Sequence, residues 1–396
     1  MIADRLYHMK KLAVITSHPI QYNAPLFKLL AERKIIQLKV FYTWGGTVTE
    51  NKYDPGFKKN IVWDIPLLEG YEYEFLENVA KDKGSHHFRG IVNPAIIERV
   101  KKYEPDAILV FGWSFVSHLK VIKHFKNKIP VYFRGDSTLL DGISLCKNLA
   151  RTFLLKYIYN NIDKALYAGE NNKKYFLKYG LQEKQLIFAP HAIDNNRFAN
   201  PDDIYRNEAL EWKRELGLQD NDFVLIFSGK LEPKKNPLFF IELLKNCTDD
   251  HLKIIVVGNG VLENELKAFA LIDKRLLLIG FQNQQKMPIV YRLADVFILP
   301  SVGPGETWGL ATNEAMASGC AVMLSEKAGG AIDLVKNGEN GIIFNPNDIK
   351  KSVNFIEELI GNKNKLIRMK EASKHLIANF SFMHIANTIE ELVLQS

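Results

Sequence analysis

The chain has 396 residues, of which 47% are hydrophobic and 24% are charged, and its formal net charge is +7. This composition is ordinary for a folded globular protein, and the length favours two domains over one. The mild basic excess lacks the dense basic stripe of a nucleic-acid-binding protein, so we expect no nucleic-acid partner.

The cysteines Cys146, Cys247 and Cys320 lie far apart and form no CxxC pair, which argues against a zinc knuckle or a disulfide framework. No apolar run is long enough to span a bilayer, and the first residues lack the apolar core of a signal peptide. We therefore expect a cytoplasmic protein, with peripheral attachment to the inner face of the membrane as an open alternative.

Short apolar runs alternate with amphipathic helical stretches along the chain, which is the pattern of βαβ units in parallel sheets. A helix near 26–32 follows the first strand, and a longer helix at 145–162 precedes the fifth. In the first half of the chain we predict strands at 12–15, 38–42, 107–111, 131–133, 165–168 and 186–189.

The second half restarts the same alternation, after a polar segment at 195–207. We therefore predict an N-terminal domain at 1–195, a C-terminal domain at 196–378, and a final helix within 379–396 that packs back onto the first domain. Two doubly wound sheets facing a central cleft bind ligands at the carboxyl ends of their strands. The strands predicted for the second domain lie at 223–227, 254–257, 276–279, 296–299, 321–324 and 341–344.

The most informative stretch is PSVGPGETWGLATNEAMASGCAVMLS, which follows the strand that ends at residue 299. Backbone N–H groups of Gly309, Leu310 and Ala311, at the start of a helix, suit a diphosphate. Glu306 and Glu314 lie on either side, and a carboxylate accepts two hydrogen bonds from a vicinal diol. This order suits a nucleotide-sugar, although spacing alone equally allows a solvated loop residue and a helix-stabilising charge.

The same stretch resembles a known family. The order E-TWGLATN-E followed by AMASGCAV resembles the E-x7-E signature of the retaining family 4 glycosyltransferases, which have the GT-B fold. FSGKLEPKKNP resembles the phosphate loop of that family, and VVGNG, IGFQ, ADVFILPS and GENGIIF resemble its other donor-domain landmarks. YAGENNKKYFLKYG and APHAIDNNRF resemble its hinge entry. The likeness is strong in the C-terminal half and weak in the N-terminal half.

The resemblance implies roles for charged residues of the second half. Glu306 would contact the donor sugar, Glu314 would hold the ribose diol, and Lys230 and Lys235 would neutralise the leaving diphosphate. Fixed cations there stabilise the transition state more than the ground state, because cleavage builds negative charge on the diphosphate. Lys230 stands where arginine is usual, so the bidentate fork is lost, and Lys234 is a neighbour that could replace Lys235. The alternative is a solvated run of charges.

Other donor residues are implied by the same resemblance. Gly229 belongs to the phosphate loop, Gly258 and Asn259 would bring the backbone close to the nucleotide, and Phe281 and Gln282 would lie near the base. The alternative interpretation of GNG, at residues 258–260, is a tight turn with no role in nucleotide binding. Because GNGVLE lacks the third glycine of a dinucleotide fingerprint, a nicotinamide-dependent dehydrogenase is disfavoured.

The sequence gives little reason to expect a metal or a cofactor. The triplet Asp220, Asn221 and Asp222 precedes a strand, where these residues are ordinary turn formers. His86 and His87 are adjacent, which suits a loop better than a shared metal. We expect a nucleotide-sugar as substrate, with lysines in place of a metal ion.

The N-terminal half should bind the acceptor, through His18 and Gln21 in the loop SHPIQY and through the loop RGDS. Related enzymes often have a histidine where this chain has Arg134 and Asp136. Asp136 could accept a proton or hydrogen bond from the acceptor, and Arg134 could add charge near the phosphates; either could instead form a structural ion pair. A front-face route needs no protein base. We interpret His191 as a hinge or packing residue.

The helix predicted at 145–162 has two interpretations. An amphipathic helix of this kind would suit contact with a membrane that carries a lipid-linked acceptor. The more common explanation is a helix packed on a sheet with a solvated polar face. Its basic residues are Lys147, Arg151 and Lys156, and its apolar ones are Leu149, Phe153, Leu154, Tyr157 and Ile158.

These features predict a retaining glycosyltransferase that moves a hexose-type sugar from a UDP- or GDP-sugar to a hydroxyl of a glycan or lipid-linked acceptor in surface polysaccharide or glycoconjugate biosynthesis. Two alternatives stay open. One is a nucleotide-sugar epimerase or hydrolase of the same fold, and the other is an inactive nucleotide-sugar-binding partner.

Overall fold

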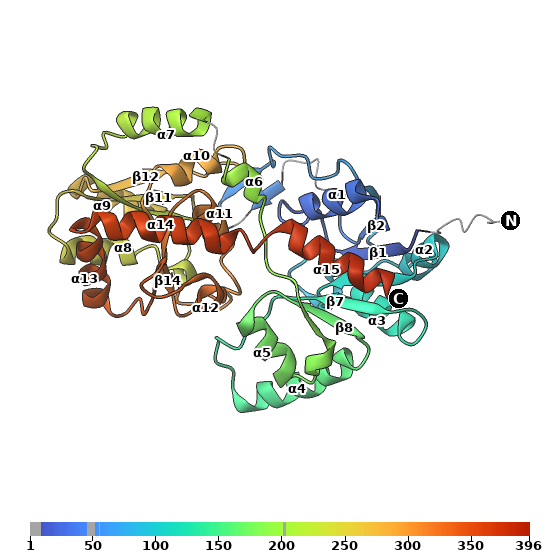
Figure 1. The fold of residues 1–396 in the computed structure, drawn as a ribbon. Coiled ribbons are helices and arrows are strands. Elements are labelled where there is room, and N and C mark those ends of the chain that lie inside the picture. The colour runs from blue at the N-terminus through green and yellow to red at the C-terminus, as the bar shows by residue number, and fades with distance from the viewer. Residues whose placement is uncertain (1–8, 46–51, 55, 201–202) are drawn as a thin grey trace.

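A computed structural model describes residues 9–45, 52–54, 56–200 and 203–396, and Figure 1 shows two α/β domains joined by crossing segments. Each domain has a parallel sheet with helices on both faces. The prediction of two parallel-sheet α/β domains is therefore confirmed. Within the described residues, no helix combines the length and the apolar character needed to cross a bilayer.

The N-terminal sheet has seven strands in the order β5-β2-β1-β6-β7-β8-β9. Its central strands are buried at all but one terminal residue each, as expected where helices cover both faces of a parallel sheet. The strands are β1 (Lys11–Thr16), β2 (Gln37–Tyr42), β5 (Glu72–Phe75), β6 (Ala107–Phe111), β7 (Val131–Arg134), β8 (Lys164–Tyr167) and β9 (Leu186–Phe188).

Between β1 and β9, the described residues form the helices α1 (Ala24–Arg33), α2 (Ile96–Tyr103), α3 (Val116–Phe125), α4 (Leu145–Tyr159) and α5 (Glu170–Lys178). The sequence analysis did not predict the edge strand β5 or the antiparallel hairpin of β3 (Lys52–Asp54) and β4 (Lys59–Ile61). The reason for missing β5 is its edge position, where Glu72 and Glu74 alternate with exposed aromatic rings instead of forming an apolar run.

The C-terminal sheet has six strands in the order β12-β11-β10-β13-β14-β15. They are β10 (Phe223–Ser228), β11 (Leu252–Val257), β12 (Leu276–Ile279), β13 (Val296–Leu299), β14 (Ala321–Ser325) and β15 (Gly341–Phe344). Around them pack α7 (Asp203–Glu215), α8 (Phe239–Asn246), α9 (Glu263–Ile272), α10 (Met287–Arg292), α11 (Ala311–Ala317), α12 (Ala331–Leu334), α13 (Ile349–Ile360) and α14 (Lys363–Ile377).

The chain passes between the domains twice, and the two passages run side by side. Ile193, just before the short helix α6 (Asn195–Phe198), forms a parallel bridge with Ser381, which precedes α15 (Phe382–Leu394). Helix α15 then packs against α1 and contributes to the N-terminal core, and Arg33 binds the buried Glu390 at 2.8 Å. The last helix of the chain thus belongs to the first domain in space (Figure 1).

Loops at the carboxyl ends of the two sheets meet each other. The loop after β7 contacts the loop after β13, since the backbone N–H of Gly305 donates to Asp141 Oδ2 at 2.8 Å. On one flank, Asn171 Nδ2 donates to the carbonyl of Gly329 at 2.9 Å. On the other flank, Asn283 Nδ2 donates to the carbonyl of Val62 at 2.6 Å. These contacts bring the two edges that doubly wound folds use for ligands into one cleft.

Candidate functional site

A cavity of about 340 Å³ lies in this cleft and is lined by both domains. The C-terminal domain contributes the loops after β10, β11 and β12 and the start of α11. Most of the predicted donor residues are brought together here, namely Gly229, Lys230, Lys235, Gly258, Phe281, Gln282, Leu310, Ala311 and Glu314. The N-terminal domain contributes Gln21, Tyr22, Phe57 and Trp63.

The lysine loop and the Gly/Pro loop before α11 are held against each other. Lys235, at the end of a 3-10 turn, forms an ion pair with Glu306, and Ser301 Oγ donates to the same carboxylate at 3.0 Å. The backbone N–H of Val302 donates to the carbonyl of Lys234 at 2.9 Å. Glu306 is buried and is not among the described lining residues of the cavity, and its ion pair fixes the position of the Lys235 ammonium.

Lys230 and Lys234 complete the cationic side of the cavity. The Lys230 ammonium lies 5.2 Å from the centre of the Phe57 ring, which comes from the opposite domain. The Lys234 ammonium lies 3.4 Å from Glu232 and is more exposed than that of Lys235. Three cations therefore face one small space, an arrangement that suits a ligand with several negative charges.

The start of α11 depends on Gly309, whose φ of +96° lies in the left-handed region. A Cβ at this position would lie 2.7 Å from the Leu299 side chain, so the chain can turn from β13 into the helix only with glycine here. Leu310 and Ala311 then line the cavity directly beside the lysines.

Glu314 lies in the first turn of α11, and only 3% of it is exposed. Its carboxylate accepts hydrogen bonds from Tyr291 Oη at 2.8 Å and from Tyr22 Oη at 3.2 Å. Burial raises the pKa of the Glu314 carboxyl, and these hydrogen bonds oppose that rise. Because an ionised carboxylate has about four lone-pair sites, it can still accept hydrogen bonds from a ligand diol.

The glycines after β10 and β11 allow two backbones to approach closely. Gly258 has a φ of +137°, and a Cβ there would lie 2.0 Å from the carbonyl oxygen of Gly229. That spacing is impossible for any side chain, so this pair of loops requires glycine. The close approach leaves the backbone of both loops open to the cavity.

Asn259 does not line the described cavity but organises the loop that does. Its Oδ1 accepts from the backbone N–H of Phe281 at 2.9 Å, and its Nδ2 donates to Glu263 Oε2 at 2.9 Å. The Phe281 ring lies with its centre 5.0 Å from that of Phe57 and 6.4 Å from that of Trp63. These rings from the two domains form an aromatic wall at one end of the cavity.

On the N-terminal side, Asp136 reaches across the cleft. Its Oδ2 accepts from Thr307 Oγ1 at 2.9 Å, directly beside Glu306 in the chain. His191 Nε2 lies 4.0 Å from the same oxygen and is buried with no hydrogen-bond partner among the described residues. Burial, together with the charge of Arg134, lowers the pKa of His191 to about 4, so its imidazole is neutral at pH 7.

Arg134 has a different environment from the one its place in RGDS suggested. It is buried, and its guanidinium donates to the carbonyl oxygens of Ala189 and Pro190 at 2.8 and 2.9 Å. Burial lowers the pKa of Arg134 to about 10, and the guanidinium still carries its charge at pH 7. These contacts favour a structural role at the hinge over a role in binding the acceptor.

His18 and Gln21 are separated by the fold of their loop. Gln21 lines the cavity, whereas His18 lies outside its described lining, with Nδ1 3.0 Å from Ser17 Oγ and its ring edge-on to Trp44. The sequence analysis overlooked Tyr22, which crosses the cleft to Glu314. Its position next to Gln21, in a loop after the first strand, was a usable signal.

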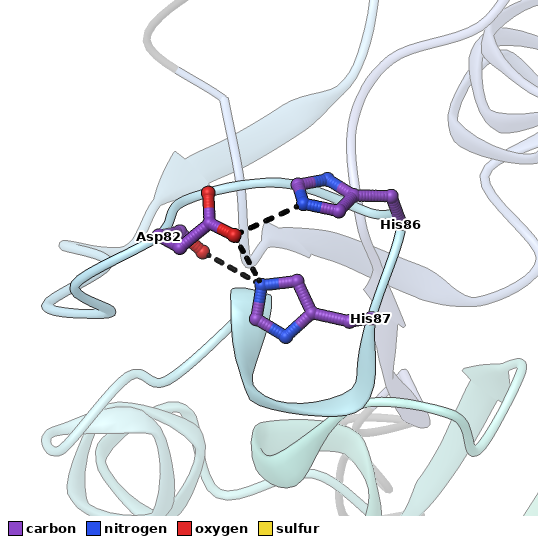
Figure 2. A group of neighbouring side chains, drawn as sticks. All are labelled: Asp82, His86 and His87. Carbon is purple, nitrogen blue, oxygen red and sulfur yellow. Dashed lines mark hydrogen bonds and ion pairs between the residues drawn. The ribbon is translucent and has the colours of Figure 1, made fainter.

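Figure 2 shows a separate cluster in the loop between β5 and α2. Asp82 Oδ2 lies 3.2 Å from Nε2 of both His86 and His87, so the three side chains are close enough to share a metal ion. The adjacency of His86 and His87 in the sequence did not predict this cluster, because only the fold of the loop brings the Asp82 carboxylate close to both rings. No residue that lines the cavity described above belongs to the cluster, whose two histidines lie within hydrogen-bond distance of Asp82.

A larger cavity of about 870 Å³ lies on the other side of α11, between α6, α7 and α14. Its lining includes Arg206, Lys213 and Lys374 but none of the predicted site residues that the structure describes. The smaller cavity is the better candidate site, since cations, carboxylates and glycine-dependent backbone converge there.

Comparisons with known proteins show which family the chain resembles. Residues 208–376 match the family described as glycosyl transferases group 1. A UDP-Gal:alpha-D-GlcNAc-diphosphoundecaprenol alpha-1,3-galactosyltransferase of Escherichia coli is 32% identical over 213 residues, which cover 52% of this chain and 53% of that protein. A D-inositol 3-phosphate glycosyltransferase of Nocardia farcinica is 28% identical over 54% of this chain and 48% of that protein. The chain thus spans about half the length of the curated relatives it matches.

Solved structures share the whole fold. A crystal structure of Anabaena HepE in complex with UDP has a TM-score of 0.72 at 19% identity and covers 98% of this chain and all of that one. WaaG, a glycosyltransferase involved in lipopolysaccharide biosynthesis, has a TM-score of 0.63 at 12% identity, over 97% of this chain. The C-terminal domain therefore matches the glycosyl transferases group 1 family over residues 208–376, within a two-domain GT-B fold.

Proposed function

We propose that this protein is a retaining glycosyltransferase of family 4, which moves a hexose-type sugar from a nucleotide-sugar to a hydroxyl of a glycan or lipid-linked acceptor. The observation that carries the proposal is the cavity in which Lys230 and Lys235 face the start of α11 and Glu314. Cations beside a buried carboxylate and a glycine-dependent backbone suit the negative charges of a diphosphate and the hydroxyls of a sugar or ribose.

The reaction breaks the bond between the anomeric carbon of the sugar and the β-phosphate oxygen, and that oxygen keeps the electron pair. Lys230 and Lys235 would stabilise the negative charge that develops there. The new bond joins the anomeric carbon to the acceptor oxygen on the same face, and the acceptor proton passes to the leaving phosphate. Asp136 and Thr307, hydrogen-bonded across the cleft mouth, would orient the acceptor hydroxyl.

Glu314 would bind the ribose diol, and Glu306 would face the sugar while it holds Lys235. We propose a UDP- or GDP-sugar as the donor, and UDP-sugars should be tested first. The Escherichia coli relative is named for UDP-Gal, and the Anabaena structure holds UDP. The lysines supply the positive charge that a divalent metal provides elsewhere, so we propose that turnover needs no metal or other cofactor.

The biological setting belongs to the same proposal. We place the reaction at the cytoplasmic face of a membrane, in surface polysaccharide or glycoconjugate biosynthesis, because the relatives include enzymes named for a diphosphoundecaprenol-linked acceptor and for lipopolysaccharide.

The decisive experiment screens UDP-, GDP-, ADP- and TDP-sugars by thermal shift and then measures turnover with and without a lipid-linked acceptor. Transfer requires a stabilising nucleotide-sugar and a glycosylated product that forms only when the acceptor is present, with the anomeric configuration of the donor retained. Product without acceptor would favour the epimerase or hydrolase, and binding without turnover would favour an inactive partner. Activity that a chelator abolishes and a divalent ion restores would refute catalysis by lysine alone.

A further inference from the structure

Helix α4 exposes an apolar face that the rest of the protein does not cover. Leu145, Leu149 and Phe153 are 82%, 61% and 74% exposed, and they follow one another at intervals of four residues. This spacing places them in one stripe along the helix. Leu154 and Tyr157, which adjoin the stripe, are also exposed.

The opposite face of α4 already provides the contacts that hold the helix to its domain. Leu155, Ile158 and Tyr159 are buried in the N-terminal core. The exposed positions Leu149, Phe153, Leu154 and Tyr157 therefore do not pack on the sheet, contrary to the more common explanation of the sequence pattern. Exposing so many large apolar groups on one helix costs solubility, and such patches mark interaction surfaces.

Cationic side chains accompany the exposed stripe. Lys147, Arg151 and Lys156 are exposed on α4, and the helix contains no acidic residue. From the neighbouring helix α3, the Lys123 ammonium lies 4.6 Å from the centre of the Tyr157 ring. Interfaces between proteins are depleted in lysine, and two copies meeting through α4 would bring these cations together. An anionic lipid surface instead complements both the apolar and the cationic groups.

The position of α4 connects this surface to the cleft. The loop that precedes the helix carries Asp136, and its Asp141 contacts Gly305 across the cleft. Lys327 Nζ donates to the carbonyl of Leu140 in the same loop at 3.4 Å. Figure 1 shows α4 at the lower edge of the N-terminal domain, beside α5. A surface that meets α4 would therefore lie next to the mouth of the candidate site.

We propose that α4 is a membrane-docking helix, which lies in the interface of an anionic bilayer with its stripe among the acyl chains and its cations at the headgroup phosphates. Docking would hold the cleft mouth at the bilayer, where a lipid-linked acceptor presents its hydroxyl. That use of the surface rests on the proposed function, whereas the docking itself does not.

The test measures binding of the full chain to vesicles of phosphatidylcholine with roughly a third phosphatidylglycerol, by flotation at low salt. The double variant Leu149→Ser/Phe153→Ser should lower vesicle binding about tenfold or more, because two large apolar groups lose their burial in lipid. The matched control is Leu271→Ser/Ile272→Ser on α9, where both side chains are more exposed than Leu149 and Phe153, at 76% and 83%. This control should bind like the wild type.

A second readout is specific to α4. Cys146 is exposed on the helix, whereas Cys247 and Cys320 are buried, so an environment-sensitive thiol probe labels α4 selectively. Its emission should shift to the blue with anionic vesicles, and the shift should diminish in Lys147→Gln/Arg151→Gln or at high salt. Circular dichroism of each variant should match that of the wild type, because all these positions are exposed.

The proposal fails if the stripe variant floats like the wild type, if the α9 control loses as much binding, or if the probe does not respond. A chain that forms dimers, which the stripe variant dissociates, and that ignores vesicles would make α4 a protein interface instead. Donor binding, followed by thermal shift with UDP-sugars, should be equal in all variants. If no variant and not even the wild type binds a UDP-sugar, the proposed function is refuted, and the docking proposal is unaffected.

Discussion

The two edges of the cleft are built from the same kind of parallel sheet, but their polar groups have different tasks. At the C-terminal edge, Lys230, Lys235 and Glu314 face the cavity, and the loops that carry them need glycine to approach one another. At the N-terminal edge, a buried set of polar side chains bonds to its own domain, whereas Tyr22 and Asp136 reach across the cleft. Under the proposed function the C-terminal edge is the donor edge, whose polar groups face the cavity, and the N-terminal edge is the acceptor edge, part of whose polar groups serve the fold itself.

A buried hydrogen-bond network in the N-terminal domain shows how polar groups at the acceptor edge serve the fold itself. Asn93 Nδ2 lies within hydrogen-bond distance of the carbonyl oxygens of Thr43, Leu76 and Glu77, which ties together the loops after β2 and β5. Thr43 Oγ1 lies 2.9 Å from His118 Nε2, and His118 Nδ1 lies 2.9 Å from the carbonyl of Gly112. The comparison predicts that substitutions at the donor edge change ligand affinity or turnover, whereas those at the acceptor edge change stability.

The largest effect should come from Lys235→Ala. We expect kcat to fall by roughly a hundredfold or more, since the charge on the leaving diphosphate loses its best-placed cation. Steady-state kinetics with the stabilising nucleotide-sugar measures this. Lys234→Ala is the matched control, because Lys234 lines the same cavity but pairs with Glu232 at its rim. Equal losses in both variants would show that the loop supplies only diffuse charge.

Arg134→Met should reduce stability and leave donor affinity nearly unchanged. Two buried carbonyl oxygens, of Ala189 and Pro190, would lose their donor, at a cost of about 2 kcal/mol. Urea unfolding measures the loss, and nucleotide-sugar binding by calorimetry is the companion measurement. A stable variant with a raised KM for the acceptor would show that Arg134 binds the acceptor, and it would contradict a structural role for this residue.

Glu314→Ala should weaken nucleotide-sugar binding by about tenfold, the effect of losing charge-assisted hydrogen bonds to a diol. Isothermal titration calorimetry with the donor gives the dissociation constant. Glu326→Ala, an exposed carboxylate of the same domain, should bind as the wild type does. Unchanged affinity in Glu314→Ala would remove the ribose role, and the carboxylate would then serve only Tyr22 and Tyr291.

The smallest effect concerns pH. Burial lowers the pKa of His118 to about 4, below the value near 6.5 that an unfolded chain has. The neutral folded state is therefore favoured above pH 6.5, and this contribution is lost as the pH falls from 6.5 towards 4, by about 1 to 2 kcal/mol at pH 5.5. Unfolding free energies between pH 7 and 5 should fall less steeply in His118→Gln than in the wild type.

His375→Gln, which removes an exposed histidine, should retain the wild-type slope. Burial likewise lowers the pKa of His191 to about 4, so part of the acid sensitivity should persist in His118→Gln. If the slopes of the wild type and His118→Gln coincide, His118 does not contribute the expected neutral-state stability.

The donor edge could be predicted in some detail because its constraints are local. Gly258, Gly309 and the lysines lie in loops that follow strand ends, where parallel sheets bind ligands, so their place at the sheet edge could be predicted. The acceptor edge could not, because the partners of its side chains are distant in the chain. The contact between Tyr22 and Glu314 joins residues 292 positions apart, and no spacing pattern in the chain predicts it.

Spacing in the chain also does not predict which partners charged residues bind or which face of a helix is buried. Arg134 and Asp136 are two residues apart, yet one bonds the hinge carbonyls and the other crosses the cleft to Thr307. Helix α4 is apolar on both faces, so its pattern alone left open which face meets the core and which stays exposed.

By itself the sequence determined the two α/β sheets, the glycines and lysines of the donor edge and the resemblance to a sugar-transferring family, because these depend on periodicity and on short-range chain geometry. Only the tertiary structure decided which residues meet across the cleft, where the Arg134 guanidinium goes and that the stripe on α4 is uncovered. Those features depend on how two domains and a returning helix dock, and docking joins surfaces whose residues are remote in the chain.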